Sequence, residues 1–372
     1  MRLVHLADLH LGHQRFNKFT GEGINQREFD VIKTFEEVIE KTKALDPDLI
    51  VIAGDMFDTP KPSNYTLKRV FEILKGVSSI PIVAIPGNHD RARKLEWISP
   101  IELLSVFPSF HSIVKNDVVR LDQLKTLIIC AAEPHDLESL LQSMPFLPRY
   151  KKIMLLHIFL KDFFNVSVTH RLHPILTKDK LTELIETYDI DYVALGDIHV
   201  NGQVTSRAYY SGSIDWVSPN FWKETETQKS FIYVDFEYDL KVHNVPITAC
   251  RDVKVLPAID CSVLTDEELL TQIEKLLSER DYSETLVKID LFNVRSYHLS
   301  SLSSNKIKSL RQKVFHLELN ISRTIEEQGT TETYLRKNVK DEFQSFLDNL
   351  KIPEATKTRL LNEFIAFSQS TN

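Results

Sequence analysis

The stretch LVHLADLHLG, residues 3–12, joins a short apolar segment to the polar pair Asp8 and His10. Its first half predicts a buried β-strand, and the polar pair follows at the point where that strand ends. Residues 25–45 have apolar side chains at helical spacing, and residues 49–53, which read LIVIA, predict a second buried strand. A strand, a helix and a strand in this order predict a βαβ unit with parallel strands.

The same alternation continues through the first two thirds of the chain. A helix at 63–76 and strands at 80–85, 126–131, 153–156 and 192–195 extend the series. We expect these strands to form a largely parallel sheet that is covered on both faces. The segments 208–211 and 231–236 are expected to belong to a second, more antiparallel sheet.

The pattern changes near residues 240–252, where a smaller α+β domain is expected to begin. Thr265 and Glu268 have the spacing of a capping box at the start of a helix. Strands are predicted at 253–256, 286–291 and 314–321, with a further helix near 302–312. Thr330 and Pro353 each suit the start of a terminal amphipathic helix. The predicted domains therefore span residues 1–245, 252–325 and 330–370.

Composition narrows the class of protein. The chain has 372 residues, of which 42% are hydrophobic and 26% charged, as is ordinary for globular proteins. Its apolar runs are too short for a membrane span. The net charge of −7 excludes binding driven by bulk positive charge, so a polyanionic ligand would need local neutralisation, for which bound metal is the candidate. Three cysteines without metal-type spacing predict a reducing, cytoplasmic setting.

Polar side chains follow five of the predicted strands. They occur in the segments Asp8-Leu9-His10, Gly54-Asp55, Gly87-Asn88-His89-Asp90, His157 and Gly196-Asp197-Ile198-His199. Because ligands bind at the carboxyl ends of parallel strands, we expect these side chains to lie close together. Mixed carboxylate, imidazole and amide groups suit Mn²⁺, Fe²⁺, Zn²⁺ or Mg²⁺. Two metals roughly 3.5–4 Å apart need about this many ligands and a bridging carboxylate, for which we choose Asp55.

Each segment alone also has a simpler explanation. Asp8 and His10 could lie at a surface strand end, and Gly54-Asp55 is commonly a turn. Asn88 could cap a helix, and a lone His157 is more often a core histidine than a ligand. The prediction of a metal site therefore depends on the order and placement of all five segments together.

These motifs resemble those of the calcineurin-like metallophosphoesterases. Within that superfamily, the stretches at 8–12, 54–58, 87–91 and 210–213 are similar to those of SbcD-type double-strand-break-repair nucleases, the catalytic partners of an SbcC-type coiled-coil ATPase. The resemblance implies an α/β fold with a metallophosphoesterase two-sheet sandwich flanked by helices. It also implies a small α+β capping domain that binds DNA and C-terminal helices that bind the partner.

The resemblance also implies the roles of the site residues. One metal would be held by Asp8, His10, Asp55 and His199. The other would be held by Asp55, Asn88, His157 and Asp197. His89 would be the catalytic histidine that is not a ligand. The implied activity is hydrolysis of DNA phosphodiesters by exonuclease and endonuclease action on duplex ends and single strands, with two divalent ions, Mn²⁺ first and Mg²⁺ as the alternative.

Asp197 departs from the resembled pattern, which usually has histidine at this position. Its added negative charge would favour a hard cation, or it would shift or weaken the second metal. Two alternative functions stay open, the first because it uses the same chemistry and the second because of Asp197. One is a phosphoesterase for small phosphodiesters or phosphoproteins, and the other is a catalytically weakened scaffold subunit.

Several further features have more than one interpretation. The segment Gln26-Arg27-Glu28, at a helix start, either approaches DNA, orients a ligand or forms a salt bridge. Asp58 either orients substrate or caps a loop. Basic residues near the strand ends either contact phosphates or are solvated: Lys61, Lys68, Arg69, Arg91, Arg93 and Lys94. The helices at 63–76 and 97–106 either build a homodimer, as the resemblance implies, or pack in the core. The terminal helices either dock on the ATPase or pack on their own domain.

Overall fold

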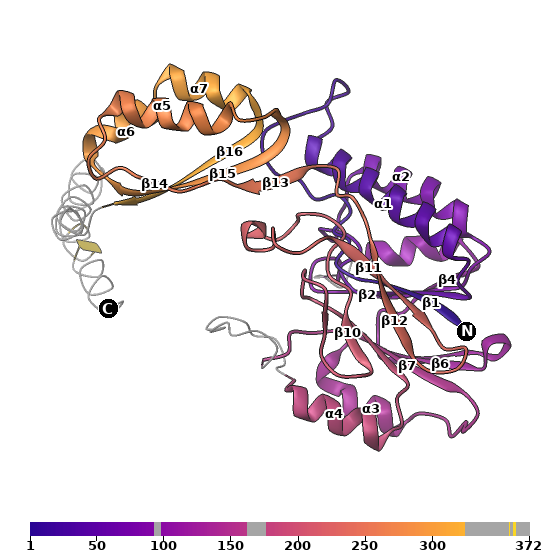
Figure 1. Cartoon of the computed structure of the whole chain (residues 1–372). Coiled ribbons are helices and arrows are strands. Elements are labelled where there is room, and N and C mark those ends of the chain that lie inside the picture. Colours follow the sequence, from indigo (N-terminus) through magenta and orange to yellow (C-terminus); the bar gives the residue numbers. More distant parts are fainter. Residues whose placement is uncertain (93–97, 162–175, 324–356, 358–359, 362–372) are drawn as a thin grey trace. The chain divides into compact units, whose positions relative to one another are not determined.

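The computed structural model describes residues 1–92, 98–161, 176–323, 357 and 360–361 (Figure 1). The chain divides into two compact units, Met1–Val253 and Lys254–Asn372. The predicted domain limits stay predictions, and the predicted terminal segment at 330–370 lies almost wholly outside the described residues. Among the helices that the structure describes, none has the length and apolar character needed to cross a membrane.

The first unit contains two six-stranded sheets. The first sheet has the order β12 (Lys241–Pro246), β11 (Ser230–Asp235), β1 (Arg2–Leu6), β2 (Leu49–Ala53), β3 (Ile82–Ile85) and β4 (Phe110–Ser112). Strands β1 to β4 are parallel to one another, whereas β11 is antiparallel to both of its neighbours. The carboxyl ends of β1, β2 and β3 therefore lie at one edge of this sheet.

The second sheet also has a parallel centre. Its order is β5 (Asp117–Leu121), β6 (Thr126–Ala131), β7 (Lys151–His157), β8 (Tyr192–Gly196), β10 (Ala208–Tyr210) and β9 (Gly202–Gln203). Strands β6, β7, β8 and β10 are parallel, and the edge strands β5 and β9 are antiparallel to their neighbours.

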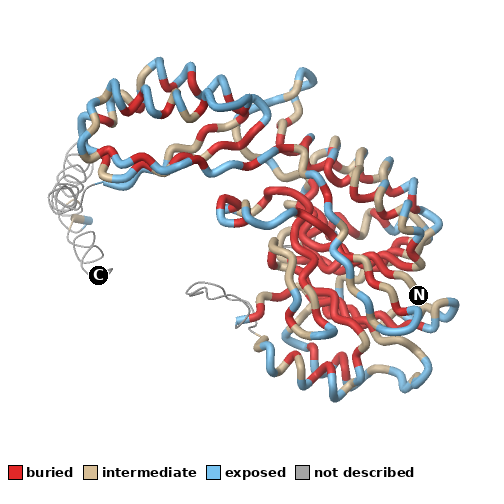
Figure 2. Tube along the Cα trace, viewed as in Figure 1, coloured by how far each residue is buried: buried red, intermediate tan, exposed pale blue. Residues whose placement is uncertain are grey.

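Alternation along β2 explains how the two sheets pack. Leu49, Val51 and Ala53 point into the core between the sheets, where they meet Ile128 and Leu155 of the second sheet. The residues between them, such as Ile50 and Ile52, face the helices and join a different core cluster. An uninterrupted apolar run therefore marks a strand that is buried on both faces, as Figure 2 shows for the central strands.

Helices cover the outer faces of the sandwich. The helices α1 (Gln26–Leu45) and α2 (Asn64–Leu74) pack on the first sheet, and α3 (Leu137–Gln142) and α4 (Lys178–Thr187) pack on the second. The predicted two-sheet sandwich flanked by helices is thus confirmed. At the predicted helix 97–106, the structure instead has 3₁₀ turns over Pro100–Val106.

The assignment of strands to one parallel and one antiparallel sheet is wrong. The strands at 126–131, 153–156 and 192–195 belong to the second sheet, not to an extension of the first. The segment at 208–210 is parallel to β8 in that second sheet, whereas 231–235 returns to the edge of β1 in the first. Buried strands of both sheets have the same apolar composition, so local sequence does not reveal which sheet a strand joins.

The second unit has a helical layer on a four-stranded sheet. The strands are β13 (Asp252–Val255), β14 (Ile259–Asp260), β15 (Tyr282–Val294) and β16 (Val314–Arg323), and the helices are α5 (Asp266–Leu277), α6 (Ser296–Leu302) and α7 (Asn305–Gln312). Its core joins Leu269 and Ile273 of α5 to Val287 of β15 and Leu317 of β16. The Thr265–Glu268 capping box is confirmed. The helix predicted near 302–312 is confirmed as α7, whereas the preceding helix α6 was not predicted.

Candidate metal centre

The polar segments predicted from the sequence come together, but from two sheets rather than one. Asp8, Asp55 and Asn88 follow β1, β2 and β3 of the first sheet. His157 ends β7 and Asp197 follows β8 in the second sheet. The two sheets thus place the carboxyl ends of their central strands at a common site. All the predicted site residues reach this region, through the contacts described below.

The backbone at these strand ends is unusual. Asp8, His10, Asp55 and Asp197 have φ values of 52°, 46°, 49° and 90°. Residues other than glycine seldom adopt φ values in this left-handed region, although aspartate tolerates such values better than most residues. Backbone outliers of this kind concentrate at functional sites because the turn directs side chains that a regular strand would direct elsewhere.

Two glycines allow the ring of His157 to sit between the sheets. A Cβ atom on Gly54 would lie 2.2 Å from Nδ1 of His157, and Gly54 has a φ of +90°. A Cβ atom on Gly196 would lie 2.7 Å from the same nitrogen and 2.1 Å from the carbonyl oxygen of Ala53. Any side chain at either position would therefore displace the imidazole or separate the sheets.

Hydrogen bonds fix which nitrogen of His157 and His10 faces the site. Nδ1 of His157 lies 2.9 Å from the carbonyl oxygen of Ala53, which can only accept. Nδ1 of His10 lies 3.0 Å from Oδ1 of Asp58, again an acceptor. Both Nδ1 atoms therefore carry hydrogen and donate. In the neutral imidazoles, Nε2 is left with a free lone pair directed into the site.

A longer chain of hydrogen bonds fixes His199 in the same way. Its Nδ1 lies 2.6 Å from Oγ of Ser218, and that hydroxyl donates to the carboxylate of Glu224. The serine oxygen must therefore accept from Nδ1–H of His199, which leaves Nε2 of His199 bare. The buried ammonium of Lys229 lies 2.7 Å from Oε2 of Glu224 and balances its charge.

When the imidazoles are neutral, as metal binding requires, the inward-facing atoms are electron-pair donors without hydrogens between them. Nε2 of His10 and Nε2 of His199 are 3.2 Å apart. Nε2 of His157 lies 3.3 Å from Oδ2 of Asp55 and 3.1 Å from Oδ1 of Asn88. Lone pairs at such distances repel unless a cation lies among them. The residues present therefore fit divalent cations, and their mixed nitrogen and oxygen donors suit transition ions.

The donors form two overlapping groups. Asp8, His10 and His199 make one group, and Asp8, Asp55 and His157 make the other, with the ligand atoms of each within 4.8 Å of one another. Oδ2 of Asp55 lies 3.7 Å from Nε2 of His10 as well as 3.3 Å from Nε2 of His157. A carboxylate placed between two donor groups in this way is suited to bridge two ions.

Electrostatics also favours a cation at this site. Burial, together with the carboxylates of Asp55 and Asp197, raises the pKa of Asp8 to about 8. Burial acts against ionisation of Asp55, but the adjacent His157 and His10 hold its pKa below the usual range. Burial would lower the pKa of His157, yet the surrounding carboxylates raise it well above its ordinary value. A bound cation would stabilise all three carboxylates in their ionised form.

His89 lies at the edge of the donor set, not within it. Its side chain is 41% exposed, and its ring stands edge-on to His10 with centroids 4.7 Å apart. Its Nδ1 lies 3.0 Å from the carbonyl oxygen of Asp58, and its backbone N–H donates to Asp55. The ring therefore has a fixed orientation and an accessible Nε2.

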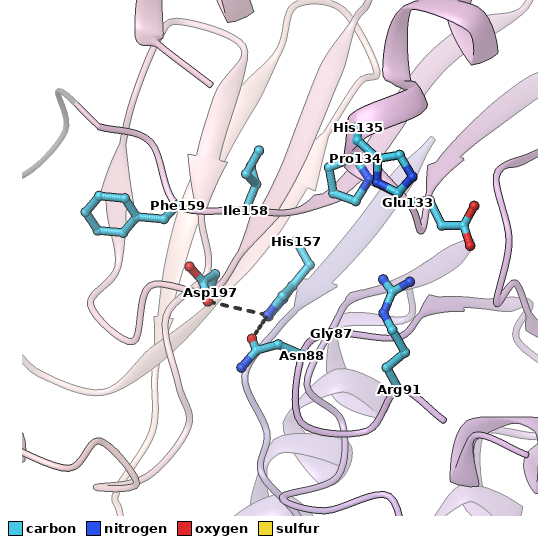
Figure 3. A pocket seen from close by; sticks show the side chains of 10 residues that line it. All are labelled: Gly87, Asn88, Arg91, Glu133, Pro134, His135, His157, Ile158, Phe159 and Asp197. Atoms are coloured by element: carbon cyan, nitrogen blue, oxygen red, sulfur yellow. Dashed lines mark hydrogen bonds and ion pairs between the residues drawn. The ribbon is translucent and has the colours of Figure 1, made fainter. Parts of the chain in front are cut away.

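A pocket of about 300 Å³ opens beside the second donor group (Figure 3). Asn88, His157 and Asp197 form part of its wall. The other lining residues are Gly87, Arg91, Glu133, Pro134, His135, Ile158 and Phe159. The predicted metal ligands of the second set are thus accessible to a molecule that enters the pocket from solvent.

Some predicted roles change in the structure. Arg27 does not approach a surface, because it is buried and lies 2.6 Å from Asp215 and 3.3 Å from Asp30. The salt-bridge interpretation is therefore correct. Arg69 contacts the carboxylates of Glu36 and Glu72 in ion pairs. Arg93 and Lys94 lie outside the described residues.

Sequence reasoning missed the residues that orient the histidines. The carboxylate of Asp58 accepts from His10 at 3.0 Å and from His13 at 3.2 Å, whereas its role toward substrate stays a prediction. Asp58 was at least visible as a polar residue near a motif. Ser218 and Glu224 had no comparable signal, because they follow the last motif and act only through the folded chain.

Comparison with known proteins agrees with this geometry. Residues 1–201 match the family model of the calcineurin-like phosphoesterases. The chain is 25% identical over 262 residues to the DNA double-strand break repair protein Mre11 of Methanocaldococcus jannaschii. The matched region covers 66% of this chain and 65% of that protein. The DNA double-strand break repair protein Mre11 of Methanococcus maripaludis is 25% identical to this chain over 375 residues, which cover 94% of this chain and 91% of that protein. The Mre11 protein of Methanopyrus kandleri is 37% identical to this chain over 106 residues, which cover 28% of this chain and 22% of that protein.

Proposed function

The chain belongs to the calcineurin-like phosphoesterase family, and from this premise we propose that it is a divalent-metal-dependent DNA nuclease that acts in the repair of double-strand breaks. The observation that carries the proposal is the convergence of bare donor atoms from both sheets, with Nε2 of His10 and of His199 only 3.2 Å apart. The similarity to proteins named for double-strand break repair supports DNA as the substrate.

The proposed ligands form two sets. Asp8, His10, Asp55 and His199 would hold one ion, and Asp55, Asn88, His157 and Asp197 would hold the other. Bound divalent ions would lower the pKa of a water molecule and offset negative charge that develops on the phosphate. Mn²⁺ is the proposed ion, with Mg²⁺ as the alternative, because carboxylate and amide oxygens make up half or more of each set.

His89 is the proposed catalytic residue that is not a ligand. Its Nδ1–H donates to the main-chain oxygen of Asp58, so the ring cannot turn freely. In the imidazolium form, Nε2 would carry the second proton toward solvent, where a leaving oxygen could accept it. The exposure of this ring suits contact with a long substrate better than enclosure of a small one.

The wider assembly is part of the proposal. We expect a homodimer and an SbcC-type ATPase partner that docks on the terminal helices, although the segment at 330–370 lies almost wholly outside the described residues. A cytoplasmic location stays a prediction.

The test uses purified full-length chain, Mn²⁺ and end-labelled duplex and single-stranded DNA. We expect DNA cleavage that a chelator abolishes and Mn²⁺ restores. Asn88→Ala and His89→Ala should each lower the rate by a factor of about 10²–10⁴, while the exposed change Asp239→Ala should leave it unchanged. Hydrolysis of bis(p-nitrophenyl) phosphate without DNA cleavage would instead indicate a small-substrate phosphoesterase. A folded chain without either activity would indicate a scaffold.

A further inference from the structure

We infer that the two cation positions are chemically unequal, so that they differ in their preference for Zn²⁺ over Mn²⁺, and that Asp197 is the residue that makes them unequal. The inference rests on the proposed metal-dependent function but concerns a property of this chain's own donors. At the first position, two of the donors are imidazole nitrogens, from His10 and His199, and their Nε2 atoms are 3.2 Å apart. Asp8 and the shared Asp55 supply the oxygens.

The second position has a different donor set. Nε2 of His157 is its only imidazole nitrogen among the described residues. Around that nitrogen lie Oδ1 of Asn88 at 3.1 Å, Oδ2 of Asp55 at 3.3 Å and Oδ1 of Asp197 at 3.8 Å. Figure 3 shows Asn88 and Asp197 both directed at the same edge of His157. The second position therefore has one nitrogen and three oxygens, whereas the first has two of each.

Backbone hydrogen bonds hold Asp197 so that its carboxylate lies within this donor set. Its backbone N–H donates to both carboxylate oxygens of Asp8, at 3.0 and 3.2 Å, and its φ is 90°. Its side chain is only 11% exposed and faces His157. A histidine here would give the second position two nitrogens, as at the first, and would remove one negative charge.

Donor type decides which ions each position prefers. Imidazole nitrogens favour Zn²⁺ and other late transition ions, whereas carboxylate and amide oxygens favour Mn²⁺ and Mg²⁺. Zn²⁺ binds most donor sets more tightly than Mn²⁺ does, but exchanging a nitrogen for a charged oxygen reduces that advantage. Because Zn²⁺ keeps part of its advantage at both positions, an excess of Mn²⁺ should displace it first from the position at His157 and Asp197, while Zn²⁺ stays at the position of His10 and His199.

The experiment measures metal partition without DNA. The full-length chain is stripped with a chelator and equilibrated with a fixed concentration of Zn²⁺ and rising excesses of Mn²⁺. Bound metals are counted by mass spectrometry, the Mn²⁺ is examined by electron paramagnetic resonance, and both ions are located by anomalous diffraction at their absorption edges. At an intermediate excess of Mn²⁺ we expect one Zn²⁺ and one Mn²⁺ per chain, with the spectrum of an isolated Mn²⁺ ion and Zn²⁺ beside His10.

Three variants separate donor type from charge. Asp197→His should bind two Zn²⁺ and lower the Mn²⁺ content about tenfold or more. Asp197→Asn keeps an oxygen but removes the charge, so its Mn²⁺ content should be intermediate. Asp239→His, at an exposed position, should bind metals as the unaltered chain does.

A change from two Zn²⁺ to two Mn²⁺ ions without a mixed state at any excess of Mn²⁺ would overturn the inference, as would an unchanged partition in Asp197→His. If Asp197→His does not fold, a partition in Asp197→Asn equal to that of the unaltered chain has the same meaning. The outcome is separate from the proposed nuclease activity. A chain that partitions the metals as expected but cleaves no DNA would keep this inference and contradict that proposal.

Discussion

The backbone N–H of Asp197 donates to both carboxylate oxygens of Asp8, which ties the end of β8 in the second sheet to the end of β1 in the first. Two sheets that met only through apolar packing could slide by fractions of an ångström. Because the bond joins residues 189 positions apart within the donor set, the spacing of the proposed metal ligands depends on the stacking of the sheets.

Gly54→Ala tests this dependence. The new Cβ would lie 2.2 Å from the His157 ring, in a backbone conformation that alanine rarely adopts. We expect a loss of about 1–3 kcal/mol in the free energy of unfolding, measured by urea denaturation. We also expect a loss of Mn²⁺ affinity, because the displaced ring belongs to the donor set. Gly21→Ala is the matched control, because no atom lies within 4 Å of its added Cβ. Equal stability of the Gly54→Ala and Gly21→Ala chains would contradict the expectation.

The sequence predicted which polar residues come together, because its evidence for them is local. Asp8 and Asp55 each follow an apolar run directly, so the strand end and the polar residue are read together. The partition of strands between the sheets was predicted wrongly, because β6, β7 and β8 are as apolar as β1 to β3. Ser218 and Glu224 were missed for a third reason: their role arises only through contacts with a residue about twenty positions away.

His5 should make the protein less stable in acid. It lies in the core between the sheets, with Nδ1 3.0 Å from the hydroxyl of Tyr192, and burial lowers its pKa to about 3. The unfolded chain therefore binds a proton below about pH 6.5 that the folded chain does not, so stability falls as the pH falls from 6.5 toward 3.

The slope from this one group is at most about 1.4 kcal/mol per pH unit. His5→Gln should reduce the slope of unfolding free energy against pH between 6 and 4, measured by urea denaturation at each pH. His243→Gln, at an exposed position in β12, should leave the slope unchanged. An identical slope in the His5→Gln chain would mean that His5 does not contribute to the acid sensitivity.

Arg27→Met should destabilise the first unit strongly. The guanidinium is buried with Asp215 and Asp30, and removing it leaves two buried carboxylates without this partner. Breaking a buried pair on one side costs about 3–5 kcal/mol. Lys33→Met, at an exposed position on the same helix, should cost less than about 0.5 kcal/mol. If Arg27→Met lowers DNA affinity without changing the unfolding midpoint in urea, the arginine contacts DNA after all.

Asp58→Ala should weaken metal binding through His10. The change removes the acceptor of Nδ1–H of His10 but keeps the main-chain oxygen that anchors His89. Loss of such an orienting partner typically costs about 10–100-fold in metal affinity. Calorimetric titration with Mn²⁺ measures the effect, and Asp239→Ala, at an exposed position, is the control. Unchanged Mn²⁺ affinity would show that packing alone orients His10.

Ser218→Ala should act on one metal position and spare the other. Without the serine oxygen, Nδ1 of His199 has no acceptor, and the ring can move its hydrogen to Nε2, where it would block the donor atom. We expect a loss of about 10–100-fold in affinity at the position of His10 and His199. The position of His157 should be unaffected, because its Nδ1 donates to Ala53 instead.

Ser218→Thr is the matched variant, since it keeps a hydroxyl between His199 and Glu224 and should retain metal binding. Nitrogen-15 NMR of labelled histidine reports the tautomer of His199 directly, and metal titration reports the affinity of each position. If Ser218→Ala kept hydrogen on Nδ1 of His199 and bound both ions as before, Glu224 would have no influence on the metal centre. If both variants lost the same affinity, the size of the side chain rather than its hydroxyl would be responsible.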